Sequence, residues 1–171
     1  AGIDIVPALR PLLSGELVIA RIDIRRPRLA PGIGLPAAAA GGDGPPALRV
    51  AHVRIEGAEV SLAAGPLPPF DADIRLDARM RPTALQARTQ DGALTVSAVA
   101  RGQGYDLALD GRDWRVPAGA PLHVDRLLAR GRLVGNRLEF DKVDARLYGG
   151  TLSGGAGLVW DEGWSLAGNA V

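Results

Sequence analysis

Residues 136–171 read NRLEFDKVDARLYGGTLSGGAGLVWDEGWSLAGNAV. Apolar and polar side chains alternate through three runs of this stretch, at 138–147, 152–160 and 164–170. The turn-forming sequences YGGT, at 148–151, and DEG, at 161–163, separate the runs. Glycine supplies the positive φ that tight hairpin turns require. The stretch therefore predicts a three-stranded antiparallel meander.

The same alternation recurs through most of the chain. It predicts a strand at 16–26, a hairpin at 48–64 that turns at 56–58, a strand at 70–80, and further apolar rows at 84–88, 94–100, 105–109 and 127–133. We therefore predict an all-β fold, an antiparallel meander of about nine or ten strands that curves into an open groove or folds into a sandwich. A single short helical turn after Pro7, near the N-terminus, is the only helix that the pattern allows.

The length of 171 residues suits a single β domain. One stretch, APGIGLPAAAAGGDGPPA at 30–47, shows no period and predicts a flexible loop rich in proline, alanine and glycine. The chain begins and ends inside patterned segments, so we expect it to be a fragment of a longer protein.

The composition argues against several classes of protein. The 20 basic residues are balanced by 19 acidic ones, so no bulk field attracts nucleic acid. The sequence has no cysteine, which excludes disulfides and thiolate metal sites. No apolar run approaches the roughly 18 residues of a membrane-spanning helix.

No constellation of catalytic residues emerges either. The two histidines, His52 and His123, are far apart and have no metal-ligand spacing. Asp71, Asp73 and Asp77 lie along a predicted strand face, whereas calcium loops need a turn within such a series. The sequence therefore predicts a protein that is not an enzyme and has no metal or cofactor.

Each predicted strand has one apolar face, and that face must be covered. With almost no helix available, the sheet either folds over itself around a dry core or curls into a trough whose aliphatic lining holds an apolar ligand such as acyl chains. A dry core is the commoner outcome for sheets with one apolar face. The strand pattern alone leaves both alternatives open.

Two segments resemble the AsmA-like family of Gram-negative bacteria. Towards the C-terminus the resemblance rests on GRLVGNRL at 131–138, LYGGTLSG at 147–154, Trp160 and Trp164. Near the N-terminus it rests on LLSGEL at 12–17 and the strand residues that follow up to Pro27. Together these segments cover about half of the chain.

This resemblance implies a function in the cell envelope. AsmA-like proteins are anchored in the inner membrane by one N-terminal helix, which is missing from this sequence, and extend into the periplasm as β structures with an apolar groove. They are similar in design to bridge-like lipid transfer proteins. The implied function is phospholipid transport between the inner and outer membrane and envelope maintenance. The implied partners are phospholipid acyl chains, the inner membrane and envelope proteins, with no nucleic acid.

The family has no catalytic residues, so the predicted site is the strand face that would line the groove. The candidates for this lining are Ile22, Ile24, Val53, Ile55, Ile74, Leu76, Val96, Leu107, Leu109, Leu138, Phe140, Leu158 and Trp160. The alternative is a non-enzymatic scaffold or protein-binding module of an envelope or secretion assembly that meets its partners through a sheet edge. A carbohydrate-binding sandwich ranks last because aromatic residues make up only 4% of the chain.

Overall fold

The structure of the chain is a computed structural model that describes residues 2–9, 11, 18–29, 49–62, 65–116, 122–160 and 164–170. The chain divides into two compact units, Ala1–Gln90 and Asp91–Val171. The loop predicted at 30–47 lies outside the described residues, and the prediction of one β domain stays a prediction. Leu9 and Pro11 have helical backbone, but most of the segment predicted to form a helical turn also lies outside the described residues.

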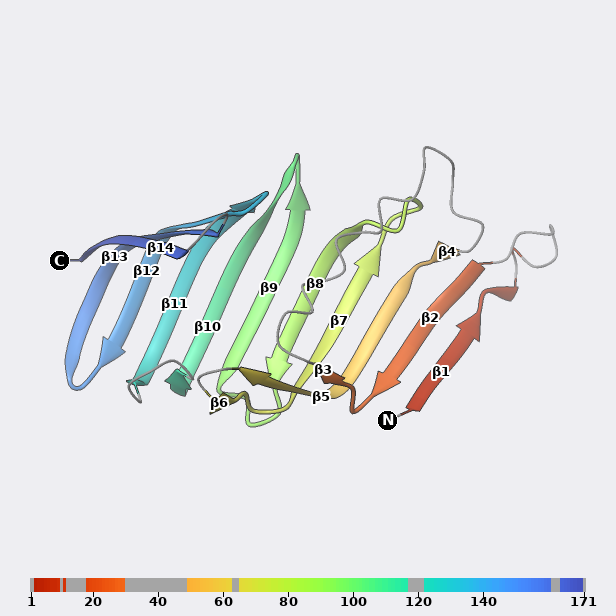
Figure 1. Cartoon of the computed structure of the whole chain (residues 1–171), viewed down its shortest axis with the longest axis horizontal. Helices are drawn as coiled ribbons and strands as arrows, with labels where there is room; N and C mark the ends of the chain where they lie inside the picture. The colour runs from red at the N-terminus through yellow and green to blue at the C-terminus, as the bar shows by residue number, and fades with distance from the viewer. Residues whose placement is uncertain are drawn as a thin grey trace. The chain divides into compact units, whose positions relative to one another are not determined.

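The first unit is a sheet with the strand order β1-β2-β5-β7-β8 (Figure 1). Its main strands are β1 (Gly2–Pro7), β2 (Val18–Arg25), β5 (His52–Leu62), β7 (Phe70–Leu76) and β8 (Pro82–Thr89). Three two-residue strands pair at the side of this path: β3 (Arg28–Leu29), β4 (Arg49–Val50) and β6 (Gly65–Pro66).

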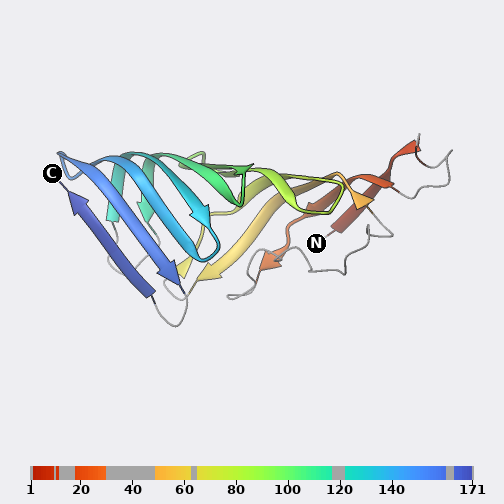
Figure 2. The ribbon, with the colours of Figure 1, turned by 90° about the horizontal axis from the view of Figure 1, so that it is seen from above.

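The second unit has the strand order β9-β10-β11-β12-β13-β14, and every pairing in it is antiparallel. Its strands are β9 (Leu94–Arg101), β10 (Gly104–Val116), β11 (Leu122–Val134), β12 (Arg137–Leu147), β13 (Gly150–Trp160) and β14 (Trp164–Ala170). The sheet curls along this order (Figure 2). The fold is thus all-β, as the alternation predicted, and mostly antiparallel, as the turn-forming sequences between the runs predicted.

The turn between β12 and β13 is the one that the YGGT sequence predicted. Leu147 pairs with Gly150, and the two residues between them have φ values of 52° at Tyr148 and 78° at Gly149. Positive φ at both central residues is the geometry whose twist matches the flanking strands of a hairpin. At the next hairpin, Trp160 stands directly opposite Trp164 in the register.

Three parallel pairings depart from the predicted antiparallel meander: β2 with β4, β2 with β5, and β3 with β5. Strands β2 and β5 are parallel, with Ile22 beside Val53 and Ile24 beside Ile55. Parallel neighbours need a long crossover connection, and more than twenty residues separate these two strands in the sequence. Alternation within a strand does not fix the direction of its neighbour, so the antiparallel prediction fails only at these three pairings.

The hairpin predicted at 48–64 is also wrong, because β5 runs straight through the expected turn. Gly57 has φ +63° and the β5–β7 register shifts between Ile55 and Ala58, which makes Gly57 part of a β-bulge. Glycine with positive φ suits a bulge as well as a turn. The sequence thus correctly indicated a positive φ at Gly57. Whether that residue forms a turn or a bulge depended on how β5 pairs with β7.

The strand predicted at 70–80 ends early, at Leu76. The Asp77 carboxylate accepts hydrogen bonds from the backbone N–H groups of Arg79 at 2.8 Å and Arg81 at 2.9 Å. Aspartate side chains that bond backbone N–H groups ahead of them favour turns over extended chain. The turn that results leads directly into β8.

Few large side chains are buried among the described residues. The buried apolar residues are Ile19, Val50, Ala58, Ala72, Ala98, Val124 and Ala129. No side chain among the described residues is below 2% exposure and large enough to anchor a conventional core. The described helical backbone includes no helix that is long and apolar enough to cross a membrane.

Candidate functional site

In the first unit, aliphatic residues form continuous rows across the sheet. The strand registers place Ile5, Ile22, Val53, Ile74 and Leu85 side by side on five successive strands. The next row joins Ile3, Ile24, Ile55, Ala72 and Ala87. Residues in register share a face because side chains alternate along each strand. The rows therefore make one apolar face, which we call the first apolar face.

The second unit repeats this arrangement. Val96 stands opposite Leu109, which stands opposite Ala129, and the row continues to Val143 and Gly154. A shift in the β11–β12 register keeps Phe140 opposite Gly131, and beyond it Leu138 stands opposite Leu133. These rows form the second apolar face.

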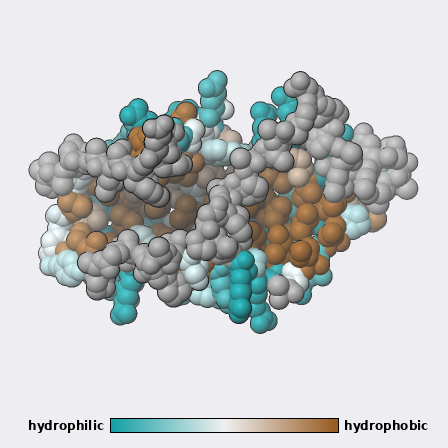
Figure 3. Space-filling view, viewed as in Figure 1, coloured by the Kyte–Doolittle hydropathy of each residue, from teal (hydrophilic) through white to brown (hydrophobic). Residues whose placement is uncertain are grey.

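The structure places the predicted lining residues on these two faces. Eleven of them are half-buried: Ile22, Ile24, Val53, Ile55, Ile74, Leu76, Val96, Leu107, Leu109, Leu138 and Phe140. The side chains of Leu158 and Trp160 lie outside the described residues, although Leu158 stands opposite Leu138 in the register. Figure 3 shows apolar residues gathered over the strands, with hydrophilic residues toward the rims. The sequence prediction missed Ile3, Ile5, Leu85 and Val143, which the registers add.

Within each unit, no second layer of described strands covers the apolar face. The substantial strand–strand contacts of the described residues all join hydrogen-bonded neighbours in the sheet. In a sandwich, strands from a facing sheet would pack on these rows at about 10 Å. Most of the larger aliphatic side chains are instead only partly buried, and Ile3 and Ile5 at the β1 edge are 67% and 58% exposed.

Phe140 combines a place on the second apolar face with a local packing role. A Cβ added to Gly131 would meet the ring atom Cδ1 and the Cα of Phe140, both at 2.8 Å, as well as the Glu139 backbone carbonyl. Glycine is therefore required where β12 closes on β11. The ring of Phe140 covers the gap that the missing side chain leaves.

The opposite face of the first unit is polar and carries ion pairs. Arg25 pairs with Asp4 at 2.8 Å, and His52 Nε2 lies 2.7 Å from Asp73 Oδ1. The three aspartates of β7 and its following turn have separate tasks. Asp71 accepts the backbone N–H of Gly57 at 2.8 Å, while the backbone N–H groups of Arg81 and Arg79 lower the pKa of Asp77.

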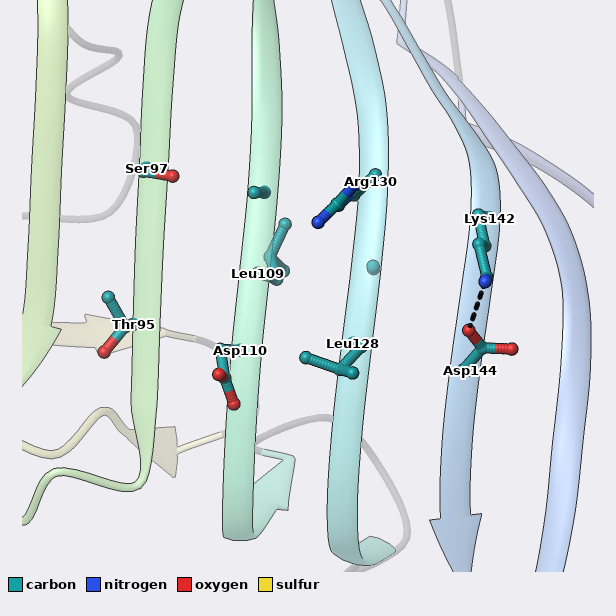
Figure 4. Close-up of a pocket in the computed structure, with 10 residues that line it drawn as sticks. Thr95, Ser97, Leu109, Asp110, Leu128, Arg130, Lys142 and Asp144 are labelled. Atoms are coloured by element: carbon teal, nitrogen blue, oxygen red, sulfur yellow. Dashed lines mark ion pairs between the residues drawn. The ribbon is translucent and has the colours of Figure 1, made fainter.

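The polar face of the second unit has a hollow of about 350 Å³. Figure 4 shows Arg130 extending from β11 toward β10, and Lys142 paired with Asp144 along β12. The Lys142–Asp144 distance is 3.2 Å, and the Ser153 hydroxyl donates to Asp144 at 2.9 Å. Ser153 and then Lys142 lower the pKa of Asp144. The other residues that line the hollow include Thr95, Ser97, Asp110 and Leu128.

The second histidine is also in an acidic setting. His123 Nε2 lies 3.0 Å from Asp113 Oδ1 and 3.5 Å from Asp125 Oδ1. The described residues nevertheless contain no group of three or more histidine, cysteine, aspartate or glutamate residues arranged to hold a metal ion. The two histidines lie in different units.

The apolar faces are therefore the most extensive candidate site. No family model, curated protein or solved structure matches this chain. The resemblance to AsmA-like proteins thus rests on the sequence motifs alone. What the geometry contributes is a half-exposed aliphatic surface on each unit, without the hydrogen-bonding groups that would orient a polar ligand.

Proposed function

We propose that the apolar faces line a groove for phospholipid acyl chains, and that the chain is a segment of an AsmA-like protein of the periplasm. In this proposal the parent protein is anchored in the inner membrane, and it moves phospholipid between the inner and outer membrane to maintain the envelope. The observation that carries the proposal is that eleven predicted lining residues are half-buried on faces with no second layer of described strands.

The chemistry of the faces supports an acyl chain as the ligand. Ile, Leu, Val and Ala side chains offer dispersion contacts but no specific hydrogen bonds, which suits a ligand that is itself a plain hydrocarbon. Each CH₂ group moved from water onto such a surface contributes about 0.8 kcal/mol. A row that crosses five strands spaced about 4.8 Å apart offers a path long enough for several such groups.

The test compares matched acidic substitutions on the two faces of each sheet. Ile74→Asp puts a charge between Val53 and Leu85 on the first apolar face. Its control, Ala84→Asp, adds the same charge on the polar face, directly opposite Arg75. Leu109→Asp and its neighbour Ala108→Asp form the equivalent pair in the second unit. Circular dichroism checks that each variant is folded.

The measurement is native mass spectrometry with lipid extraction on the 171-residue chain purified from a bacterial periplasm. We expect the wild-type chain and the two control variants, Ala84→Asp and Ala108→Asp, to retain phospholipid at a defined stoichiometry. The folded Ile74→Asp and Leu109→Asp variants should lose it, because burying an unpaired carboxylate against hydrocarbon is costly. A well-folded, lipid-free wild-type chain would contradict the proposal.

One observation favours the alternative, a scaffold that binds protein through a sheet edge. Strand β1 pairs with β2 on one side and with no other strand of the described residues, and its Ile3 and Ile5 are exposed. An extended partner segment added there would gain backbone hydrogen bonds and cover both isoleucines. A Val6→Pro substitution in β1 should abolish such pairing without changing lipid retention on the second unit.

A further inference from the structure

Three arginines stand in one register row on the polar face of the second unit. Arg112 of β10 is directly opposite Arg126 of β11, which is directly opposite Arg146 of β12. We call these three residues the arginine row. All three are exposed. Like charges directly opposite one another destabilise a sheet, so this arrangement has a folding cost that isolated surface arginines do not have.

Little negative charge offsets the row within the protein. Arg112 Nε lies 3.8 Å from Asp110 Oδ1, which is a long contact. No ion pair is formed by Arg126 or Arg146 within the described part of the second unit. Asp144, two residues before Arg146, is already held by Lys142 and Ser153. The guanidinium groups are therefore available to anions from outside the chain.

Further positive charge lies on the same face. Arg130 stands directly opposite Lys142. This pair is four residues along β11 and β12 from the Arg126–Arg146 pair. Arg130 also lines the polar hollow, where it extends toward β10 (Figure 4). The concentration of cations on this face is local, since the whole chain has a net charge of only +1. Such a patch attracts an anionic partner at short range.

We propose that the arginine row docks the chain onto the phosphate groups of an anionic phospholipid surface. Guanidinium groups bind phosphate through paired N–H donors. Neighbouring strands are about 4.8 Å apart, so the row spans roughly 10 Å and presents its donors to several phosphates rather than to one. All three arginines are exposed on the face of the sheet, which suits a surface better than a small enclosed ligand.

One feature disfavours nucleic acid as the source of the phosphates. Proteins that bind single strands interleave cations with aromatic rings on which bases stack. The arginine row continues to Thr151 on β13, so no aromatic residue is part of it. The proposal is independent of the lipid groove, because the arginine row is on the polar face and the groove would be on the apolar one.

The test is sedimentation of the full chain with vesicles at low salt. The vesicles are phosphatidylglycerol mixed with phosphatidylcholine, or phosphatidylcholine alone. Each arginine near an anionic surface strengthens binding by about fivefold, so Arg126→Gln with Arg146→Gln should weaken it roughly thirtyfold. The control, Arg88→Gln, removes an exposed arginine that stands opposite Asp71 in the first unit and should leave binding within about twofold of wild type.

A gain-of-binding variant separates docking from misfolding. Asp110→Asn removes the carboxylate next to Arg112 and should strengthen vesicle binding. Equal binding to phosphatidylcholine alone, or an equal loss in Arg88→Gln, would overturn the proposal. So would displacement of the chain from vesicles by stoichiometric pyrophosphate or by single-stranded DNA, because either would identify a soluble ligand. The two proposals can fail separately. If the variant with Arg126→Gln and Arg146→Gln loses vesicle binding but still retains lipid when purified from the periplasm, the groove proposal is unaffected.

Discussion

The backbone N–H of Gly57 donates a hydrogen bond to Asp71 Oδ1 at 2.8 Å. This bond joins the bulge of β5 to the beginning of β7, the strand beside it. The Gln90 side chain also donates to Asp71 Oδ1, at 3.3 Å. Asp71 therefore serves the fold of the first unit, although it belongs to an aspartate series that could be mistaken for a ligand set.

We predict that Gly57→Ala destabilises the chain by about 1–2 kcal/mol, because φ of +63° is unfavourable for a residue with a Cβ. Urea denaturation followed by circular dichroism measures the change. Gly157→Ala is the control, since its φ is not positive and a Cβ there would meet nothing within 4 Å. An equal loss in both variants would mean that the bulge geometry is not the cause.

Gly131→Ala should be more damaging than Gly57→Ala. The new methyl group would overlap the Glu139 carbonyl and the Phe140 backbone, which belong to the paired strand and have no room to move away. We expect a loss of more than about 2 kcal/mol, or a second unit that no longer folds. Thermal unfolding provides the measurement, and Gly150→Ala, with its nearest contact at 3.6 Å, should behave like wild type.

The pH dependence of stability should reflect Asp77. The backbone N–H groups of Arg81 and Arg79 bond its carboxylate and lower its pKa in the folded chain. Stabilisation from a lowered pKa is complete above the ordinary aspartate value of about 3.9 and is lost as pH falls through the lowered one. Urea midpoints of wild type and Asp77→Asn should therefore converge as pH falls from 6 to about 2. A constant gap across this range would contradict the assignment.

Removing the centre of the arginine row should stabilise the sheet. Arg126→Gln relieves repulsion with both Arg112 and Arg146, and we expect a gain of about 0.5 kcal/mol at low salt. The gain should shrink at high salt, where the charges are screened. Differential scanning fluorimetry at the two salt concentrations tests this, with Arg88→Gln as the charge-matched control. A wild-type chain more stable than the variant would mean that the row is held by unrecognised partners.

Which strand residues share a face could be predicted because side chains in extended chain alternate with a period of two. Ile74 and Leu76 followed this rule, as did Val96 with its cross-strand neighbour Leu109. The turn at Tyr148 and Gly149 was predictable for a similar reason, since a two-residue hairpin is decided by the residues within it. The aliphatic lining residues could thus be named from local pattern, as members of a face rather than as parts of a site.

Sequence alone determined the all-β class, the apolar and polar faces of the strands, and the tight turn between β12 and β13. Only the tertiary structure decided that β2 and β5 are parallel, that Gly57 forms a bulge, and that three arginines share one row. The physical reason is that these features are pairings between segments distant in the sequence. Local alternation specifies which way a side chain points, whereas strand partner and register depend on contacts formed when the sheet assembles.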